Sequence, residues 1–289
     1  MRNEKEMNKL ILDIARNDDR IRAVIMNGSR ANPNASPDIF QDYDIVYVVT
    51  EVDCFKNDSE WIDQFGEMMI MQRPDDMQDP PPDDKDSYAF LMQFADGNRI
   101  DLTLFPAAKL DEMWRDSLSI LLLDKDGMIE PFPPPSEKDY LPKPPTEKEY
   151  ADCCNEFWWV STYIAKGLWR EEIIYAKSMQ DQYVRPMMMK MLDWYIGIKT
   201  EFSCNPGKLG KHFRQYLEPE LWEMVQSSYA DANYARTWDA LQEMCRLFQI
   251  TSRFVAEHSS FEYPIDDDLK VSAHLEHVRS LPRNAPEMY

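Results

Sequence analysis

A proline-rich segment divides this chain of 289 residues into two parts of different character. Residues 130–146, EPFPPPSEKDYLPKPPT, contain seven prolines. Because proline fixes its own φ angle and donates no backbone hydrogen bond, such a run is typical of an extended, semi-rigid connector. Helix and strand patterns alternate before the segment, and only helical patterns follow it. We therefore predict two domains of an α+β protein: a mixed sheet flanked by helices over residues 1–135, and an all-α domain over residues 136–289.

The charge balance restricts the partners of the chain. Acidic residues number 52 and basic residues 32, so the net charge is −20. Such a surface repels a phosphate backbone, and we expect no nucleic-acid partner; it attracts metal ions and amino sugars. No stretch approaches the ~18 apolar residues of a membrane span, so we expect no membrane association. The five cysteines have no metal-ligand spacing, which favours reduced thiols in a cytoplasmic protein. The sequence leaves the oligomeric state open, and a monomer is one possibility.

Hydrophobic periodicity predicts the elements of each part. In the first part we expect helices at 3–17, 59–72 and 109–117, strands at 21–26, 42–50, 87–95 and 99–105, and a short apolar element at 118–123. The turn Asp96-Gly97-Asn98 suits a hairpin. In the second part Thr146 and Glu149 fit a capping box that begins a helix. That helix extends to about residue 170, and we expect further helices at 171–183, 186–200, 218–229, 235–258 and 266–280.

A Gly-Ser turn follows the first predicted strand. Gly28 allows the backbone to turn tightly and to approach a ligand. Backbone amides, the Ser29 hydroxyl and the Arg30 guanidinium would suit phosphate oxygens. Taken alone, this dipeptide is more often an ordinary turn.

Asp42 and Asp44 begin the strongest strand pattern, DYDIVYVVT. Side chains alternate along a strand, so both carboxylates point to one face. Like charges on one face repel each other, and a cation between them would relieve the repulsion. Mg²⁺ is commonly held by one or two carboxylates and substrate phosphates. The alternative is a solvated strand end.

Asp101 interrupts a later apolar strand, RIDLTLF, where it shares a face with Arg99 and Thr103. A carboxylate in the middle of such a strand is seldom there for packing. It would complete a metal site or accept the proton of an attacking hydroxyl. An exposed sheet face is the alternative.

Together these pieces form a specific pattern: a strand, Gly-Ser, twelve residues, Asp-x-Asp on a second strand, and a later single Asp. This resembles the polymerase β-like nucleotidyltransferase superfamily. The strings MNGSRANPNASPDIFQDYDIVYVV, ADGNRIDLTLFP, LLLDKDG and FWWVSTYIAKGLWREEIIYAK resemble one member family more closely, the aminoglycoside 6-adenylyltransferases, which modify streptomycin.

The resemblance implies a function and a set of roles. The first domain would bind the nucleotide and the metal, and the helical domain the acceptor. Asp42, Asp44 and Asp101 match the metal-binding and catalytic carboxylates, with Asp101 similar to the general base of related enzymes. Gly28 and Ser29 match the triphosphate-binding turn, with Arg30 beside them. The expected cofactor is Mg²⁺, with ATP as co-substrate.

The helical part offers candidates of its own. Lys166 and Arg170 share a helix face, with Lys177 nearby. The resemblance favours Lys166 as a contact of the β- and γ-phosphates; the alternative is a solvated basic edge. A cationic acceptor would need carboxylates and aromatic faces. The candidates near this segment are Glu156, Glu171, Glu172, Asp181, Asp193, Trp158, Trp159, Trp169 and Tyr175.

We therefore expect Mg²⁺-dependent transfer of AMP from ATP to a hydroxyl of an aminoglycoside, with streptomycin at its 6-position as the first choice. This reaction releases pyrophosphate and inactivates the drug. Three alternatives remain. The acceptor could be a lincosamide or an unknown metabolite. The acceptor could be RNA, which the negative charge disfavours. The chain could also be a catalytically silent nucleotide-binding relative.

Overall fold

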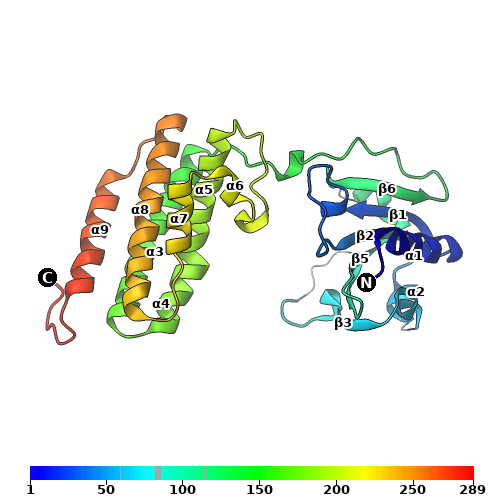
Figure 1. The fold of residues 1–289 in the computed structure, drawn as a ribbon, viewed down its shortest axis with the longest axis horizontal. Helices are drawn as coiled ribbons and strands as arrows, with labels where there is room; N and C mark the ends of the chain where they lie inside the picture. Colours follow the sequence, from blue (N-terminus) through cyan, green and yellow to red (C-terminus); the bar gives the residue numbers. More distant parts are fainter. Residues whose placement is uncertain (59, 82–85, 114) are drawn as a thin grey trace. The chain divides into compact units, whose positions relative to one another are not determined.

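The computed structural model describes residues 1–58, 60–81, 86–113 and 115–289. The chain forms two compact units, Met1–Asp139 and Tyr140–Tyr289. The boundary between the units falls within the proline-rich segment. Each unit has its own hydrophobic cluster. Figure 1 shows the strands of the first unit and the helices of the second.

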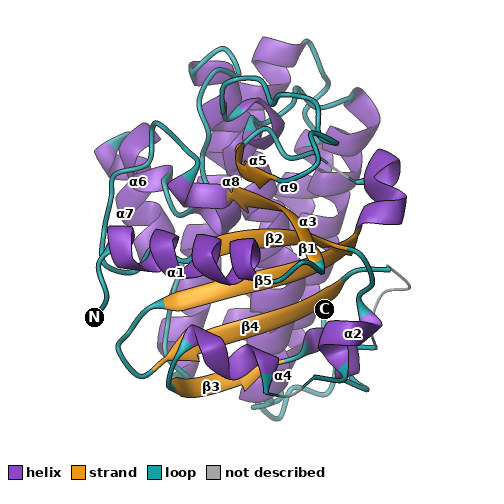
Figure 2. Cartoon of the chain, turned by 90° about the vertical axis from the view of Figure 1, so that its right-hand side faces the viewer, coloured by secondary structure: helices purple, strands orange, loops and turns teal. Residues whose placement is uncertain are grey.

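The first unit contains a six-stranded sheet in the order β3-β4-β5-β2-β1-β6. Its strands are β1 (Ile21–Asn27), β2 (Tyr43–Val49), β3 (Met68–Gln72), β4 (Tyr88–Phe94), β5 (Arg99–Pro106) and β6 (Ser119–Asp124). Only β2 and β5 pair in parallel among these strands; the other pairs are antiparallel. Figure 2 shows β5 between β4 and β2, so the sheet is mixed, as predicted.

Helix α1 (Glu4–Asn17) covers one face of this sheet, which confirms the predicted helix at 3–17. Asn3 and Glu6 form a capping box that satisfies the first free amides. The buried face of the helix joins the main cluster, and the Tyr47 hydroxyl donates to the Ile11 carbonyl oxygen at 2.6 Å. A second, short helix, α2 (Asp53–Lys56), adds Phe55 to the same cluster. This face of the sheet is therefore apolar and closed.

The predicted helix at 59–72 is wrong for the described residues; Ser59 lies outside them. The segment forms a 3₁₀ turn, Trp61–Phe65, followed by strand β3. Gly66, at φ +118°, ends the turn in a conformation that a helix does not allow. Trp61 and Phe65 are buried and meet edge to face, with their ring centroids 5.5 Å apart. The chain that follows is then placed to pair with β4.

The helix predicted at 109–117 is also wrong for the described residues. A short 3₁₀ segment, Ala107–Glu112, is interrupted at Lys109, where φ is −115°. Trp114 lies outside the described residues. The apolar element predicted at 118–123 is the edge strand β6, which pairs with β1. The hairpin turn at Asp96-Gly97-Asn98 is confirmed between β4 and β5.

The second unit is helical, as predicted. It contains α3 (Glu147–Trp169), α4 (Ile173–Met179), α5 (Arg185–Lys199), α6 (Phe213–Tyr216), α7 (Pro219–Ser227), α8 (Tyr234–Ser259) and α9 (Ile265–Ser280). The capping box of Thr146 and Glu149 is confirmed at the start of α3. Phe157 of α3 stacks on Phe248 of α8 with ring centroids 3.7 Å apart, inside a cluster that spans the helices.

The predicted boundary near Pro186 takes another form. Helix α4 continues through a π-helical turn, Gln180–Val184, directly into α5. Proline removes the hydrogen bond to the carbonyl four residues earlier, and a π turn is one way to accommodate the altered bonding. No helix in the described ranges has the length and apolar character needed to cross a membrane.

Candidate active site

A row of polar side chains crosses four neighbouring strands of the first unit. Asn27 of β1 pairs with Ser119 of β6 on one side and with Asp44 of β2 on the other. Asp44 pairs in turn with Asp101 of β5. Residues paired across adjacent strands point to the same face of a sheet. The Ser119 hydroxyl donates to Asn27 Oδ1 at 2.7 Å, which fixes one end of the row.

The row lies at the open end of its face. Farther along the same strands, Ala23, Ile25 and Val48 pack against Ile129 in a small separate cluster. That cover leaves the acidic end accessible: the Asp42 and Asp101 side chains are 38% and 23% exposed. A ligand can therefore reach the carboxylates while the rest of the sheet stays closed.

Gly28 brings the backbone directly against Asp44. Its φ is +72°, a conformation that favours glycine, and a Cβ atom built there would lie 2.2 Å from Asp44 Oδ2. Any side chain at this position would displace the carboxylate. The Gly-Ser turn and the Asp-x-Asp strand, separated in the sequence, thus form one site.

The carboxylates destabilise one another in their charged form. Burial, followed by the charges of Asp101 and Asp42, raises the pKa of Asp44 to about 6. Burial also raises the pKa of Asp42, against the opposing effect of Arg99. Desolvation and like charges favour the neutral acid, whereas a bound cation would favour the carboxylate. The site is therefore poised to take up positive charge.

Arg99 supplies part of that charge and was not among the residues predicted from the sequence. Its Nε and Nη2 atoms donate to the two Asp101 oxygens, each at 2.7 Å, and Nε lies 3.7 Å from Asp42 Oδ2. The alternation in RIDLTLF places Arg99 and Asp101 on one face, so the signal was present. The guanidinium bridges the carboxylates from outside the Asp-x-Asp motif.

The donor set fits a hard divalent cation in its chemistry. Carboxylate oxygens are the ligands that Mg²⁺ prefers, and two or three of them are available here. In the described part of the chain, however, no three acidic, histidine or cysteine side chains converge closely enough to enclose a metal ion. Asp101 does not join the other two carboxylates in such a cluster because both of its oxygens accept hydrogen bonds from Arg99. Asp42 and Asp44 are therefore the better-placed pair.

Ser29 and Arg30 lie in the 3₁₀ turn that follows β1. Arg30 holds the loop before β2: its Nε donates to the Asp42 carbonyl oxygen at 3.0 Å and its Nη2 to the Gln41 carbonyl oxygen at 2.8 Å. Its guanidinium also lies 3.7 Å from the centre of the Tyr43 ring. These contacts make Arg30 a clamp that positions Asp42, with little freedom to reach a phosphate. Ser29 stays half-buried beside it.

Lys166 belongs to the second unit. It is exposed on α3, with its ammonium nitrogen 4.7 Å from the centre of the Tyr163 ring. Lys177, by contrast, is engaged: it donates to the Ala230 carbonyl oxygen at 3.0 Å and lies 3.6 Å from Asp181. Of the two lysines, only Lys166 forms no hydrogen bond or ion pair with another described residue.

Comparison with known proteins identifies the family. The sequence profile described as streptomycin adenylyltransferase matches residues 1–278. The chain is 42% identical over 269 residues to an aminoglycoside 6-adenylyltransferase of Campylobacter jejuni, covering 93% of each chain. It is 41% identical over 270 residues to that of Bacillus subtilis (strain 168), covering 93% of this chain and 95% of the relative. A crystal structure of an aminoglycoside 6-adenyltransferase from Bacillus subtilis aligns at a TM-score of 0.48 and 36% identity, over 97% of this chain and 100% of that one. The chain therefore belongs to the streptomycin adenylyltransferase family and is a nucleotidyltransferase.

Proposed function

We propose that this enzyme transfers AMP from ATP to a hydroxyl of an aminoglycoside, with Mg²⁺, and releases pyrophosphate. Streptomycin, modified at its 6-position and thereby inactivated, is the proposed acceptor. The observation that carries the proposal is Asp44, a desolvated carboxylate with a pKa of about 6, beside Asp42 and Asp101 and against the Gly28 turn. The family and the names of its relatives support the aminoglycoside as acceptor. The five free cysteines are consistent with a cytoplasmic site of action.

Asp42 and Asp44 would hold the metal, and Asp101 would serve as the general base. When bound, Mg²⁺ supplies positive charge that offsets the charge developing on the phosphoryl and leaving oxygens. The attacking hydroxyl gives its proton to an Asp101 oxygen, which requires that Arg99 release at least one of the two. Ser29 and the neighbouring backbone amides would position the phosphates.

A carboxylate in the helical unit suits a cationic acceptor. Asp193 on α5 is half-buried and forms no hydrogen bond or ion pair with the rest of the described chain. Burial raises its pKa to about 6. An ammonium or guanidinium group of the acceptor would pair with it. Of the predicted tryptophans, Trp158 is buried in the core and Trp159 is 59% exposed, so Trp159 is the better aromatic candidate.

The test is pyrophosphate release with ATP and Mg²⁺ across a panel of aminoglycosides. We expect release with streptomycin and little with the others. Asp101→Asn should lower the rate by roughly 10²–10⁴-fold, the usual contribution of a general base. Asp19→Asn, an exposed carboxylate of the same unit away from the row, is the matched control and should leave the rate unchanged.

The outcomes separate the alternatives. Release only with a lincosamide or another small molecule would reassign the acceptor and keep the chemistry. Wild-type turnover in Asp44→Asn would refute the metal assignment. Absence of release with every acceptor, together with nucleotide binding, would indicate a silent relative.

A further inference from the structure

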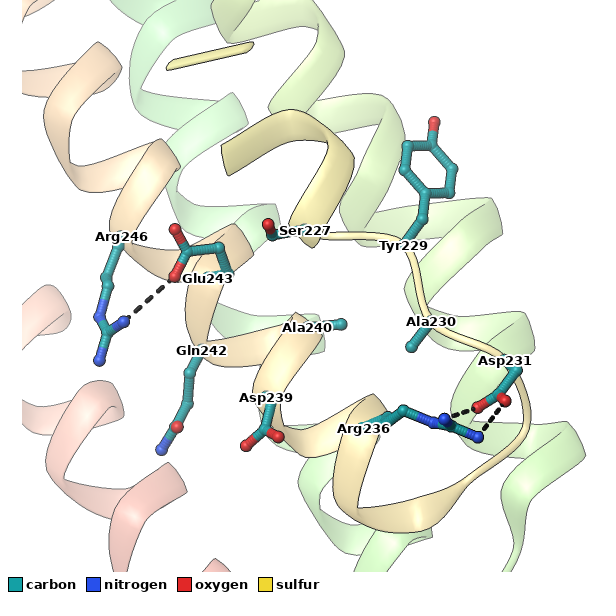
Figure 3. A pocket seen from close by; sticks show the side chains of 10 residues that line it. All are labelled: Ser227, Tyr229, Ala230, Asp231, Arg236, Asp239, Ala240, Gln242, Glu243 and Arg246. Atoms are coloured by element: carbon teal, nitrogen blue, oxygen red, sulfur yellow. Dashed lines mark hydrogen bonds and ion pairs between the residues drawn. The ribbon is translucent and has the colours of Figure 1, made fainter. Parts of the chain in front are cut away.

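In one cavity of the helical unit, every charged lining side chain already has a partner among the described residues. The cavity has a volume of about 790 Å³ and lies beside α8 (Figure 3). Its charged side chains are paired with one another: Arg236 with Asp231, and Arg246 with Glu243. Asp239 is paired with Arg279 of α9. A ligand here would have to break existing ion pairs.

A second pocket, of about 340 Å³, is lined by cations that have no acidic partner among the described residues. One wall is α3, with Tyr163, Lys166, Trp169 and Arg170. The other wall is formed by the end of α9 and by residues 281–288. Pockets of 300–1,000 Å³ with mostly apolar walls and a few convergent polar groups are typical of small-molecule sites.

Two unpaired cations mark one side of this pocket. Lys166 and Arg170 are four residues apart on α3, so their side chains share a face. Neither side chain forms a hydrogen bond or an ion pair with any part of the chain that the structure describes; the Lys166 ammonium nitrogen lies 4.7 Å from the centre of the Tyr163 ring. Both lie at the C-terminal end of α3, where the helix dipole favours cations, and Glu287 lines the same pocket without pairing with either. Their charges are available to an anion.

The opposite wall is fixed in place. Trp169 Nε1 donates to the Leu281 carbonyl oxygen at 3.1 Å, and Arg283 pairs with Glu171 at 3.0 Å. The Tyr289 ring stacks on His277 with centroids 4.7 Å apart. These contacts hold residues 281–289 against α3 and α9, so the pocket exists before a ligand arrives. Because the family profile ends at residue 278, this wall lies beyond the matched segment.

We propose that this pocket binds an organic phosphate with an aromatic body, a nucleoside monophosphate being the class that fits. The phosphate would pair with Lys166 and Arg170, and the flat body would lie against Trp169 and the apolar wall of the pocket. The inference goes beyond the proposed function and does not depend on it. It requires neither Mg²⁺ nor the carboxylate row.

The experiment is calorimetric titration of the full-length protein in EDTA with AMP, adenosine, inorganic phosphate and pyrophosphate. We expect AMP to bind more tightly than the other three, since only AMP has both the anion and the ring. Adenosine binding as tightly as AMP would show that the cations contribute nothing and would overturn the proposal. Phosphate or pyrophosphate binding as tightly would overturn the role of the aromatic wall. Absence of AMP binding would overturn the proposal entirely.

Variants locate the binding. Arg170→Gln should weaken AMP about tenfold, the effect of losing one charge-assisted hydrogen bond. Arg246→Gln removes an arginine from the other cavity and should have no effect. In protein labelled with 5-fluorotryptophan, the ¹⁹F resonance that disappears in Trp169→Phe should shift on AMP addition. An unmoved Trp169 resonance, or equal affinity in Arg170→Gln, would contradict the site. Because EDTA removes the metal, these results are independent of whether Asp44→Asn abolishes transfer.

Discussion

Replacing Asp44 with asparagine should stabilise the metal-free enzyme while abolishing its activity. The folded protein raises the pKa of Asp44 from 3.8 to about 6, first by burial and then through the charges of Asp101 and Asp42. Each pKa unit corresponds to about 1.36 kcal/mol, so ionised Asp44 costs the fold about 3 kcal/mol at neutral pH. Asparagine removes that charge at nearly constant volume, and about 3 kcal/mol is the upper limit of the gain, because the amide is also desolvated.

The pH dependence has a definite sign. Since the folded pKa lies above the unfolded value, the folded protein binds more protons between pH 4 and 6. The Asp44 contribution to stability is fully present below about pH 3.8 and is lost as the pH rises through about 6. The asparagine variant lacks this contribution at every pH. Its advantage over the wild type should therefore be largest at pH 7 and shrink toward zero near pH 4.

Differential scanning calorimetry in EDTA measures this directly. A gain of about 3 kcal/mol should raise the midpoint of one transition by roughly 6–12 °C at pH 7. Added Mg²⁺ and nucleotide should stabilise the wild type more than the variant. Asp19→Asn again serves as the control, since its carboxylate lies outside the row. A midpoint that falls in Asp44→Asn, or a difference that does not change with pH, would refute the argument that the site stores electrostatic strain.

Three further perturbations test other contacts. Gly28→Ala should lower both activity and the unfolding midpoint, since its Cβ would lie 2.2 Å from Asp44 Oδ2 and positive φ costs an alanine about 1–2 kcal/mol; wild-type values for both would contradict this contact. Arg99→Gln should destabilise the metal-free protein and raise its affinity for Mn²⁺, because the guanidinium no longer competes for Asp101; unchanged Mn²⁺ binding in titration calorimetry would count against it. Asp268→Ala should destabilise the helical unit by about 3 kcal/mol or more, because it leaves Arg253, Gln249 and Tyr263 without their buried acceptor; a denaturation midpoint like that of the wild type would exclude this role.

Most strands of the sheet could be predicted from the sequence because each strand pattern depends on residues that are close together in the chain. Alternating side chains placed Asp101 on one face of its strand, and the strong strand pattern at 42–50 fixed the orientation of Asp44. The hairpin turn and the capping box of Thr146 and Glu149 likewise depend on a few adjacent residues. The helical half was equally accessible, since long amphipathic patterns survive tertiary packing.

What the sequence left undetermined depends on contacts between distant segments. The segment at 59–72 has enough apolar residues for a helix, yet Gly66 and the free edge of β4 make it a turn and a strand. Arg30 suited a phosphate by type, but its geometry commits it to backbone carbonyl groups at Gln41 and Asp42. A local sequence pattern does not show whether a side-chain donor such as the Arg30 guanidinium is already bonded to another part of the chain.

Whether a charged group already has a partner also decides the electrostatics of this site. A protein with net charge −20 has 32 basic residues with which to neutralise its carboxylates, and at two other places it does so: Asp268 pairs with Arg253, and Asp96 with Arg2. At the row of polar side chains, Arg99 pairs closely with Asp101 and lies 3.7 Å from the neighbouring Asp42, and the pKa of Asp44 remains raised. Folding therefore retains an uncompensated negative charge at one place on the sheet. If the proposed function holds, a divalent cation would offset that charge when it binds, and the energetic cost in the free enzyme would become binding energy for the cation and its phosphates.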